Sequence, residues 1–138
     1  MSQDNLSLKE RIQLMAGDDN EPITPTEFSN LILDDTQIKQ ITQNDKEYLN
    51  LFVNLEKLCM NHTGLKNLNN LPDKLHLVQL ELSDNHIDGT ELNKILVFKN
   101  NLAILKISNN KIDTLEQVKV LAAMSHLVQL DLSENPVC

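Results

Sequence analysis

The sequence predicts an α/β solenoid, a right-handed curved coil with a parallel concave sheet and an N-terminal capping helix. The first observation is an internal repeat: residues 77–85 read LVQLELSDN, and residues 127–135 read LVQLDLSEN. The second is the template L-x-x-L-x-L-x-x-N-x-L, which fits the chain five times. The third is composition, since Leu and Ile dominate a chain with no Trp, three Phe and one Tyr. Uniform aliphatic units of this kind indicate one structural unit stacked on itself.

The five units start at Phe28, Leu55, Leu77, Leu102 and Leu127, with spacings of 27, 22, 25 and 25 residues. This template and this period are typical of a leucine-rich repeat. The x-L-x-L part of each unit is predicted to be a short strand, whose alternate side chains point into the core. We expect a single leucine-rich-repeat domain over residues 1–138, with the five repeats in residues 28–138.

The Asn position of the template marks the turn after each strand. Asn85, Asn110 and Asn135 occupy it in the last three units, and Thr36 and Thr63 occupy it in the first two. An amide can satisfy the backbone groups of a buried turn, whereas a hydroxyl can do only part of this. We therefore expect the first two turns to be less regular.

Residues 1–27 are predicted to form a lid, consisting of a cap helix and a loop. Ser7 and Glu10 have the spacing of a capping box, and Gly17 is placed to end the helix. Helical spacing brings together an apolar stripe of Leu8, Ile12 and Met15. A solenoid needs such a cover at each open end.

The segments between strands predict helices on the convex side. Their expected N-caps are Asp45, Thr90 and Thr114. The side chains expected to face the core are Tyr48, Leu51 and Phe52 in the first helix, Leu92, Ile95 and Leu96 in the second, and Leu115, Val118, Leu121 and Ala122 in the third. The segment between the second and third units contains Pro72, which predicts an extended segment or a single tight turn.

No second lid follows the fifth repeat, because the sequence stops at Cys138. A bare last coil would expose Leu127, Leu130 and Leu132. We expect that a C-terminal cap and tail are absent from this sequence and that the native protein continues. The alternative is a short natural protein with a frayed end.

The net charge of −8 argues against nucleic-acid binding, which depends on cationic side chains at phosphates. It suits basic partners, although an acidic surface also serves simply to keep a protein in solution. Cys59 and Cys138 lack a C-x-x-C spacing and are predicted to be reduced thiols in an intracellular protein. Neither a signal peptide nor a membrane-spanning run is recognisable.

Positions three, five, seven and eight of each unit are expected to project from the concave face. The acids there outnumber the lysines by six to two, which accounts for −4 of the net charge. The predicted partner-binding residues are Ile32, Asp34, Asp35, Lys57, Asn61, His62, Glu81, Asp84, Lys106, Asn109, Asp131 and Glu134. The concave surface of a solenoid is its usual binding surface, and charge would steer a basic segment to it. The alternative is a row of solvated strand positions with no partner.

No catalytic residue, cofactor or metal site is predicted, and we expect that the protein is not an enzyme. Cys59 and His62 lie close enough in the repeat to suggest a nucleophile and its base, but a shallow repeat surface offers little enclosure. Two ligands without a second pair do not make a zinc site. The acidic pairs Asp18–Asp19 and Asp34–Asp35 lack the spacing of a calcium loop.

Residues 60–89, MNHTGLKNLNNLPDKLHLVQLELSDNHIDG, resemble the acidic leucine-rich nuclear phosphoprotein 32 kDa family. The LPDKL…LELSDNHIDG portion is the most specific part. ERIQL near the N-terminus and PTEFSNLILDDTQI are similar to that family's opening helix and first repeat. This sequence departs from the family in lacking the C-terminal cap and the acidic tail. Its fifth repeat also differs, because it has the sequence LSENPVC.

The resemblance implies a nuclear, or nuclear and shuttling, adaptor with chaperone-like activity. It implies binding of basic protein segments such as histones, inhibition of histone acetylation and inhibition of protein phosphatase 2A. The alternative is a structural leucine-rich-repeat subunit that clasps one fixed partner, as in a spliceosomal ribonucleoprotein. We expect a monomer that binds neither membranes nor nucleic acid directly.

Overall fold

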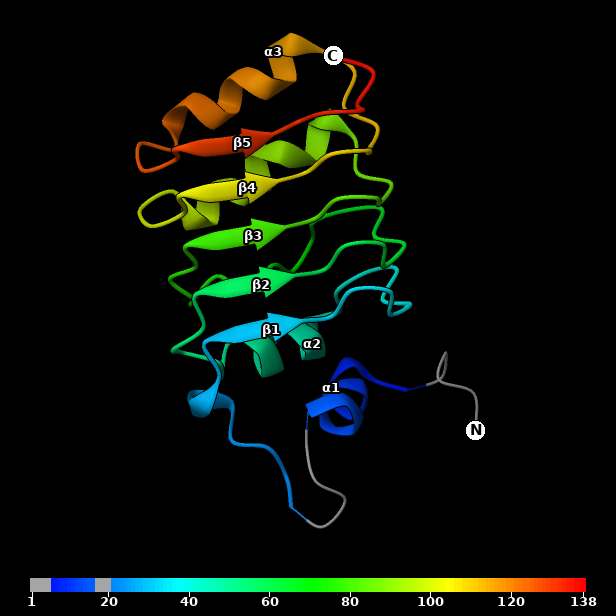
Figure 1. Cartoon of the computed structure of the whole chain (residues 1–138), viewed down its shortest axis with the longest axis vertical. Coiled ribbons are helices and arrows are strands. Elements are labelled where there is room, and N and C mark those ends of the chain that lie inside the picture. The colour runs from blue at the N-terminus through cyan, green and yellow to red at the C-terminus, as the bar shows by residue number, and fades with distance from the viewer. Residues whose placement is uncertain (1–5, 17–20) are drawn as a thin grey trace.

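Five short parallel strands form one sheet in the computed structural model, which describes residues 6–16 and 21–138 (Figure 1). In chain order they are β1 (Asn30–Ile32), β2 (Lys57–Cys59), β3 (Gln79–Glu81), β4 (Ile104–Lys106) and β5 (Gln129–Asp131). Each strand begins at the third position of a predicted repeat unit, so the phase of the template is confirmed. The registers align one leucine from every coil in a single row: Leu31, Leu58, Leu80, Leu105 and Leu130. The predicted leucine-rich-repeat solenoid is therefore confirmed.

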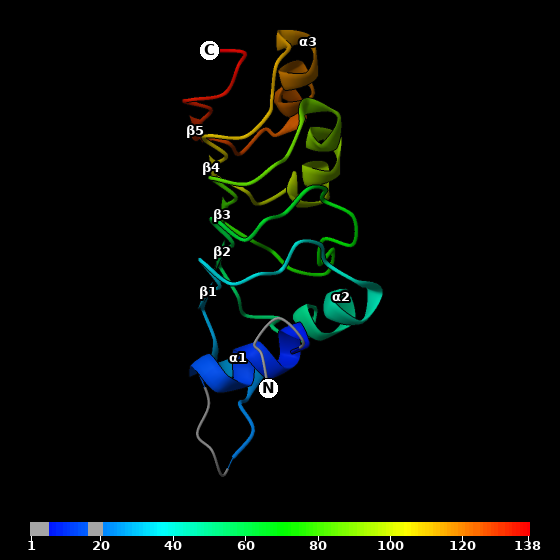
Figure 2. The ribbon, with the colours of Figure 1, turned by 90° about the vertical axis from the view of Figure 1, so that its right-hand side faces the viewer.

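The core lies between this sheet and the segments that connect its strands. Figure 2 shows the strands along one side of the molecule, and α2 (Gln43–Leu49) and α3 (Leu115–Val118) along the other. Leu58, Leu80 and Leu105 are fully buried, whereas Leu130 in the last coil is 37% exposed. The expected exposure of Leu127 and Leu132 is only partial, because both side chains pack against the coil before them.

The buried asparagines satisfy backbone groups of their own turns, as predicted, and they also join neighbouring coils. The Asn85 amide nitrogen donates to the carbonyls of Met60 and Leu82, at 2.9 and 3.0 Å. Its side-chain oxygen accepts from the backbone N–H groups of Thr63 and Leu65, at 2.9 and 3.1 Å. Asn110 and Asn135 repeat this pattern one and two coils further on.

The threonines at the same position make fewer of these hydrogen bonds, as expected of a hydroxyl. The expected irregularity of the first two turns is not observed, because Asp35 and His62 have the same left-handed φ as the equivalent residues of the other coils. The Thr36 hydroxyl donates to the Leu33 carbonyl at 2.7 Å, and the Thr63 hydroxyl donates to the Met60 carbonyl at 3.0 Å. Each hydroxyl thus satisfies one carbonyl of its own turn. Thr63 still depends on Asn85 of the next coil for its backbone N–H.

Two of the three predicted helix caps are wrong by a few residues. The N-cap of α2 is Thr42, whose hydroxyl accepts from the Asp45 N–H, while the Asp45 carboxylate accepts from the Thr42 N–H. Asp45 is therefore the third residue of a capping box and not the cap itself. The 3-10 helix η3 (Gly89–Phe98) is capped by Asp88, whose carboxylate accepts from the Thr90 N–H at 2.8 Å. The predicted cap at Thr114 is confirmed, because its hydroxyl accepts from the Gln117 N–H.

The convex segments are largely 3-10 helix, which changes the residues that face the core. In η3, Leu92, Ile95 and Phe98 are buried at intervals of three, and Leu96 is only partly buried. After α3, the 3-10 helix η4 (Lys119–Ala123) buries Leu121, while Ala122 is exposed. A 3-10 helix has about 3.0 residues per turn. Core positions that are predicted with the α-helical period of 3.6 residues therefore shift away from the buried side of the helix.

Two other side chains that were predicted to face the core, Leu115 and Leu51, are exposed because of where their helices begin and end. Leu115 is 65% exposed, because it is the first residue of the short helix α3. Leu51 is also exposed, since α2 ends at Leu49 and the chain has already turned outward. Leu49 occupies the core position instead, beside the predicted and observed Phe52 and the partly buried Tyr48.

The helix α1 (Leu8–Ala16) lies against the first coil, as the predicted N-terminal lid should (Figure 1). The Ser7 hydroxyl accepts from the Glu10 N–H at 3.1 Å, and Leu8 and Ile12 are buried. Met15 is exposed, contrary to the predicted stripe, and Gly17 lies outside the described residues. A short 3-10 helix, η2 (Pro25–Glu27), leads into β1.

Across the described residues 6–16 and 21–138, every helix is too short or too polar to cross a lipid bilayer.

Candidate functional site

The predicted partner-binding residues lie on the strands and on the turns that follow them. Positions three and five of each unit are in the sheet, and positions seven and eight follow it. None of the twelve concave-face residues (Ile32, Asp34, Asp35, Lys57, Asn61, His62, Glu81, Asp84, Lys106, Asn109, Asp131 and Glu134) is buried. The repeat phase therefore brings them to one solvent-accessible surface.

Position eight has the same unusual backbone conformation in all five coils. The φ angles of Asp35, His62, Asp84, Asn109 and Glu134 lie between 50° and 66°. This left-handed region is uncommon for residues other than Gly, Asn and Asp. Its recurrence fixes the direction of the chain after every strand, so the position-eight side chains form an ordered rim beside the sheet.

Position seven forms a hydrogen-bonded chain from coil to coil. The Asp34 carboxylate accepts from the backbone N–H of Asn61 at 2.9 Å and from its side-chain amide at 3.3 Å. The same amide donates to Glu81 at 3.0 Å, and its oxygen accepts from the Ser83 N–H at 2.7 Å. The Ser83 hydroxyl then accepts from Ser108 N–H at 3.1 Å. Asn61 thus holds two concave-face carboxylates in place.

The rim has equivalent contacts at position eight. The His62 ring nitrogen Nδ1 and the Asp35 carboxylate are 2.8 Å apart, and both side chains are well exposed. The Asn109 amide donates to the Asp84 carboxylate at 2.8 Å. Within the described chain, the Glu134 carboxylate has no hydrogen-bond or ion-pair partner. Most of these acids therefore join coils together while remaining open to solvent.

Glu81 is the most enclosed of the concave-face acids. Burial on its own would raise the pKa of Glu81, but hydrogen bonds from Asn61 and Gln79 and the charges of Lys106 and Lys57 outweigh it, so the pKa is lowered. The Lys57 ammonium lies 3.9 Å from the Glu81 carboxylate. Hydrogen bonds from the Ser133 hydroxyl and N–H lower the pKa of Asp131. Both carboxylates therefore stay ionised at neutral pH.

Cys59 is in β2 at a concave position, but its predicted accessibility is wrong. The side chain is only 3% exposed. Burial, followed by the nearby charge of Glu81, raises the pKa of the Cys59 thiol to about 11. A catalytic cysteine needs the opposite shift, since the thiolate is the nucleophile. His62, its suggested partner, is engaged with Asp35.

In the part of the chain that the structure describes, no group of three or more His, Cys, Asp or Glu side chains is arranged to hold a metal ion.

A shallow groove of about 550 Å³ runs beside the position-eight rim. Asp35, His62, Asp84 and Asn109 line it, together with His86 and Lys111, which were not among the predicted partner-binding residues. His86 and Lys111 are at template position ten in the third and fourth units. Their shared template position is the signal in the sequence that points to them, although position ten lies outside the strand and the turn residues predicted to form the face.

Comparisons with known proteins agree with this architecture. No family model matches the chain. Over 70 residues it is 43% identical to the acidic leucine-rich nuclear phosphoprotein 32-related protein of Plasmodium falciparum (isolate 3D7). The match covers 51% of this chain but only 25% of that relative.

The crystal structure of an internalin from Listeria monocytogenes has a TM-score of 0.62 at 17% sequence identity. That likeness covers 93% of this chain and 43% of the internalin, and it shows the fold alone. The predicted resemblance is thus confirmed over half of the sequence: the chain is a leucine-rich-repeat solenoid similar to an acidic leucine-rich nuclear phosphoprotein 32-related protein.

Proposed function

We propose that the chain is a non-enzymatic protein-interaction module that binds a basic protein segment on its concave face. One observation carries this proposal. Six carboxylates and two lysines are gathered on a single accessible surface, which holds half of the net charge of −8. A negative surface of this kind attracts lysine- and arginine-rich segments and accelerates their association.

The arrangement of the acids supports binding beyond simple attraction. Asn61 orients Asp34 and Glu81, and Asn109 orients Asp84. These amides are neutral, so they hold the carboxylates in place without cancelling their charge, although Glu81 also lies 3.9 Å from the Lys57 ammonium. A surface ordered before the partner arrives loses less entropy on binding.

Histones are the proposed partners, and protein phosphatase 2A is a second one. The support is the resemblance of residues 60–89 and the similarity to a relative whose name describes a nuclear phosphoprotein. We propose a nuclear location on the same grounds, with shuttling to the cytoplasm. The matched relative is about four times longer than the matched stretch, so its activities as a whole protein are proposals for this chain.

The test is a charge reversal on the concave face. The variant combines Glu81→Lys, Asp84→Lys, Asp131→Lys and Glu134→Lys. The matched control makes the same change in charge at exposed acids outside this face: Glu27→Lys, Glu47→Lys, Asp113→Lys and Glu116→Lys. Binding to purified core histones is measured by fluorescence anisotropy, and circular dichroism checks that each protein is folded.

We expect the concave variant to bind at least about tenfold more weakly than the control, because four favourable charge contacts become repulsive. Equal losses in both variants would show that net charge alone attracts histones. Unchanged binding in the concave variant would exclude the concave face as the site.

The fixed-partner alternative has one observation in its favour. Val128 and Leu130 of the last coil are exposed apolar side chains on or beside β5. A partner that covers them would bind mainly through apolar area, and such binding weakens little with salt. A complex that survives 1 M NaCl and fails with Val128→Asp would favour this alternative over the histone proposal.

A further inference from the structure

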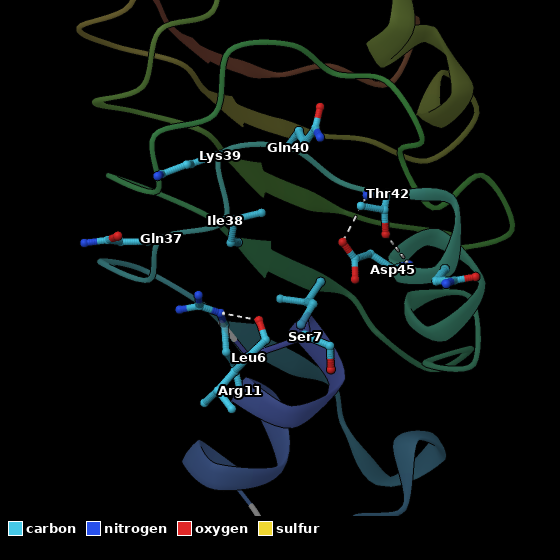
Figure 3. A pocket seen from close by; sticks show the side chains of 11 residues that line it. Leu6, Ser7, Arg11, Gln37, Ile38, Lys39, Gln40, Thr42 and Asp45 are labelled. Carbon is cyan, nitrogen blue, oxygen red and sulfur yellow. Dashed lines mark hydrogen bonds between the residues drawn. The ribbon is translucent and has the colours of Figure 1, made fainter. Parts of the chain in front are cut away.

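A second hollow lies at the N-terminal end of the solenoid, away from the concave face. Its volume is about 400 Å³, and it lies between the start of α1, the loop after β1 and the start of α2 (Figure 3). None of the twelve concave-face residues lines it. Its chemistry is also different, because its lining includes two cationic side chains, Arg11 and Lys39.

The most important feature of the hollow is the largely buried side chain of Arg11. It is only 8% exposed, and its Nε–H donates to the Leu6 carbonyl at 3.3 Å. A guanidinium carries five N–H donors, so four remain. Among the described residues, these four have no hydrogen-bond acceptor, and no carboxylate lies within ion-pair distance. A largely buried cation without a counter-ion is costly, and an anion in the hollow would remove that cost.

Among the described residues, the rest of the lining adds several donors and one acid. Gln37, Gln40 and Asn44 contribute side-chain amides, and Figure 3 draws Gln37 and Lys39 on the same side of the hollow as the Arg11 guanidinium. Asp45 is the only acid among the described residues of the lining, and one of its oxygens accepts from the Thr42 N–H at 3.0 Å in the capping box of α2. Its negative charge offsets one of the two cations, which leaves one positive charge in excess. The hollow is therefore a local cationic site on a protein of net charge −8.

We propose that this hollow binds an oxyanion of the phosphate type. The planar fork of Arg11 presents two parallel N–H groups to two oxygens of the anion, which is the geometry that guanidinium groups offer to phosphate and carboxylate. Lys39 supplies a second positive charge, which favours a dianion over a single carboxylate. The neighbouring amides donate to the remaining oxygens.

The experiment titrates the ¹⁵N-labelled full chain with inorganic phosphate at pH 7.5, against sodium chloride at matched ionic strength. We expect saturable shifts of backbone amide resonances near Arg11 and in residues 37–44, with phosphate and not with chloride. Arg11→Gln should weaken binding by at least about tenfold, since it removes a charge-assisted bidentate contact. Lys39→Gln should weaken it several-fold.

Lys9→Gln is the matched control. Lys9 is on the same helix and loses the same charge, but its ammonium lies over the Tyr48 ring, 5.7 Å from the centroid, and not in the hollow. It should bind phosphate like the wild type. Arg11→Lys keeps the charge without the fork and should fall between wild type and Arg11→Gln, which covers the case in which Arg11→Gln does not fold.

Three results would overturn the proposal: shifts that do not saturate, equal shifts with chloride, or phosphate binding by Arg11→Gln that is no weaker than binding by Lys9→Gln. Arg11 would then serve only to hold the Leu6 carbonyl. A peptide that contains phosphoserine is titrated in parallel, to distinguish a protein-bound phosphate from the free ion. Tighter binding than inorganic phosphate supports the site and assigns the phosphate to a protein, and equal binding supports the site for the free ion.

Discussion

The buried asparagines hold neighbouring coils of the solenoid together, because each one makes several hydrogen bonds to backbone groups. Asn110 donates to the carbonyls of Leu82 and Ile107 and accepts from the Ile87 N–H, so one amide joins two coils. Each of these backbone groups is buried, and each would be left without a partner by a shorter side chain. A buried donor or acceptor that loses its partner costs about 1–3 kcal/mol.

Asn110→Ala is therefore expected to lower the free energy of unfolding by about 2–4 kcal/mol, as several backbone groups lose their partners at once. The control is the neighbour Asn109→Ala, which loses one exposed hydrogen bond to Asp84 and places Ala at a left-handed φ of 50°, so it should cost about 1 kcal/mol. Urea denaturation of the two variants measures the difference. A loss below that of Asn109→Ala would show that water replaces the amide.

Glu81 predicts a dependence of stability on pH. Its pKa is lowered in the folded protein, so the ionised form is favoured by folding. Its contribution is fully present above the ordinary carboxyl pKa of 4.5 and is lost as pH falls through the lower folded value. Glu81→Gln should flatten this part of the stability profile in urea titrations between pH 7 and pH 3. An unchanged slope in the variant would assign the acid sensitivity to other carboxylates.

At the level of elements, the strands were predictable and the helices were less so. The strand period of two, combined with the fixed template, places every strand at the correct residues. The convex segments have no such constraint, and the prediction for them used the α-helical period of 3.6 residues. The observed 3-10 period of η3 instead buries Phe98, which the helical pattern left out, while the start of α3 exposes Leu115, which the pattern included.

This difference can be measured. Phe98→Ala should lower the free energy of unfolding by about 3–5 kcal/mol, because it empties a filled core position. Leu115→Ala, at a position that is 65% exposed, should change it by less than about 1 kcal/mol. Thermal and urea unfolding of the pair give the comparison. The reverse order of effects would restore the 3.6-residue period for these segments.

For the whole molecule, the repeat explains why the candidate site could be located and why its contacts could not. Twelve residues on five coils share one surface because the registers repeat the same template position. The contacts between Asp34, Asn61 and Glu81 depend on which side chains happen to be neighbours in successive coils. The hollow at Arg11 depends on how α1 packs against the first coil, which no repeat pattern encodes.

The two proposed sites should be coupled only through long-range charge. The fourfold concave reversal brings the net charge from −8 to zero, so phosphate should bind at Arg11 more tightly in that variant at low salt. The gain should vanish near 1 M NaCl, where the Debye length is about 3 Å. Arg11→Gln, in turn, should leave histone binding nearly unchanged. Phosphate titrations at two salt concentrations and histone anisotropy measure both directions. A gain that persists at high salt would mean that the concave face and the hollow communicate through the packing of the first coil, and not through the field of the protein.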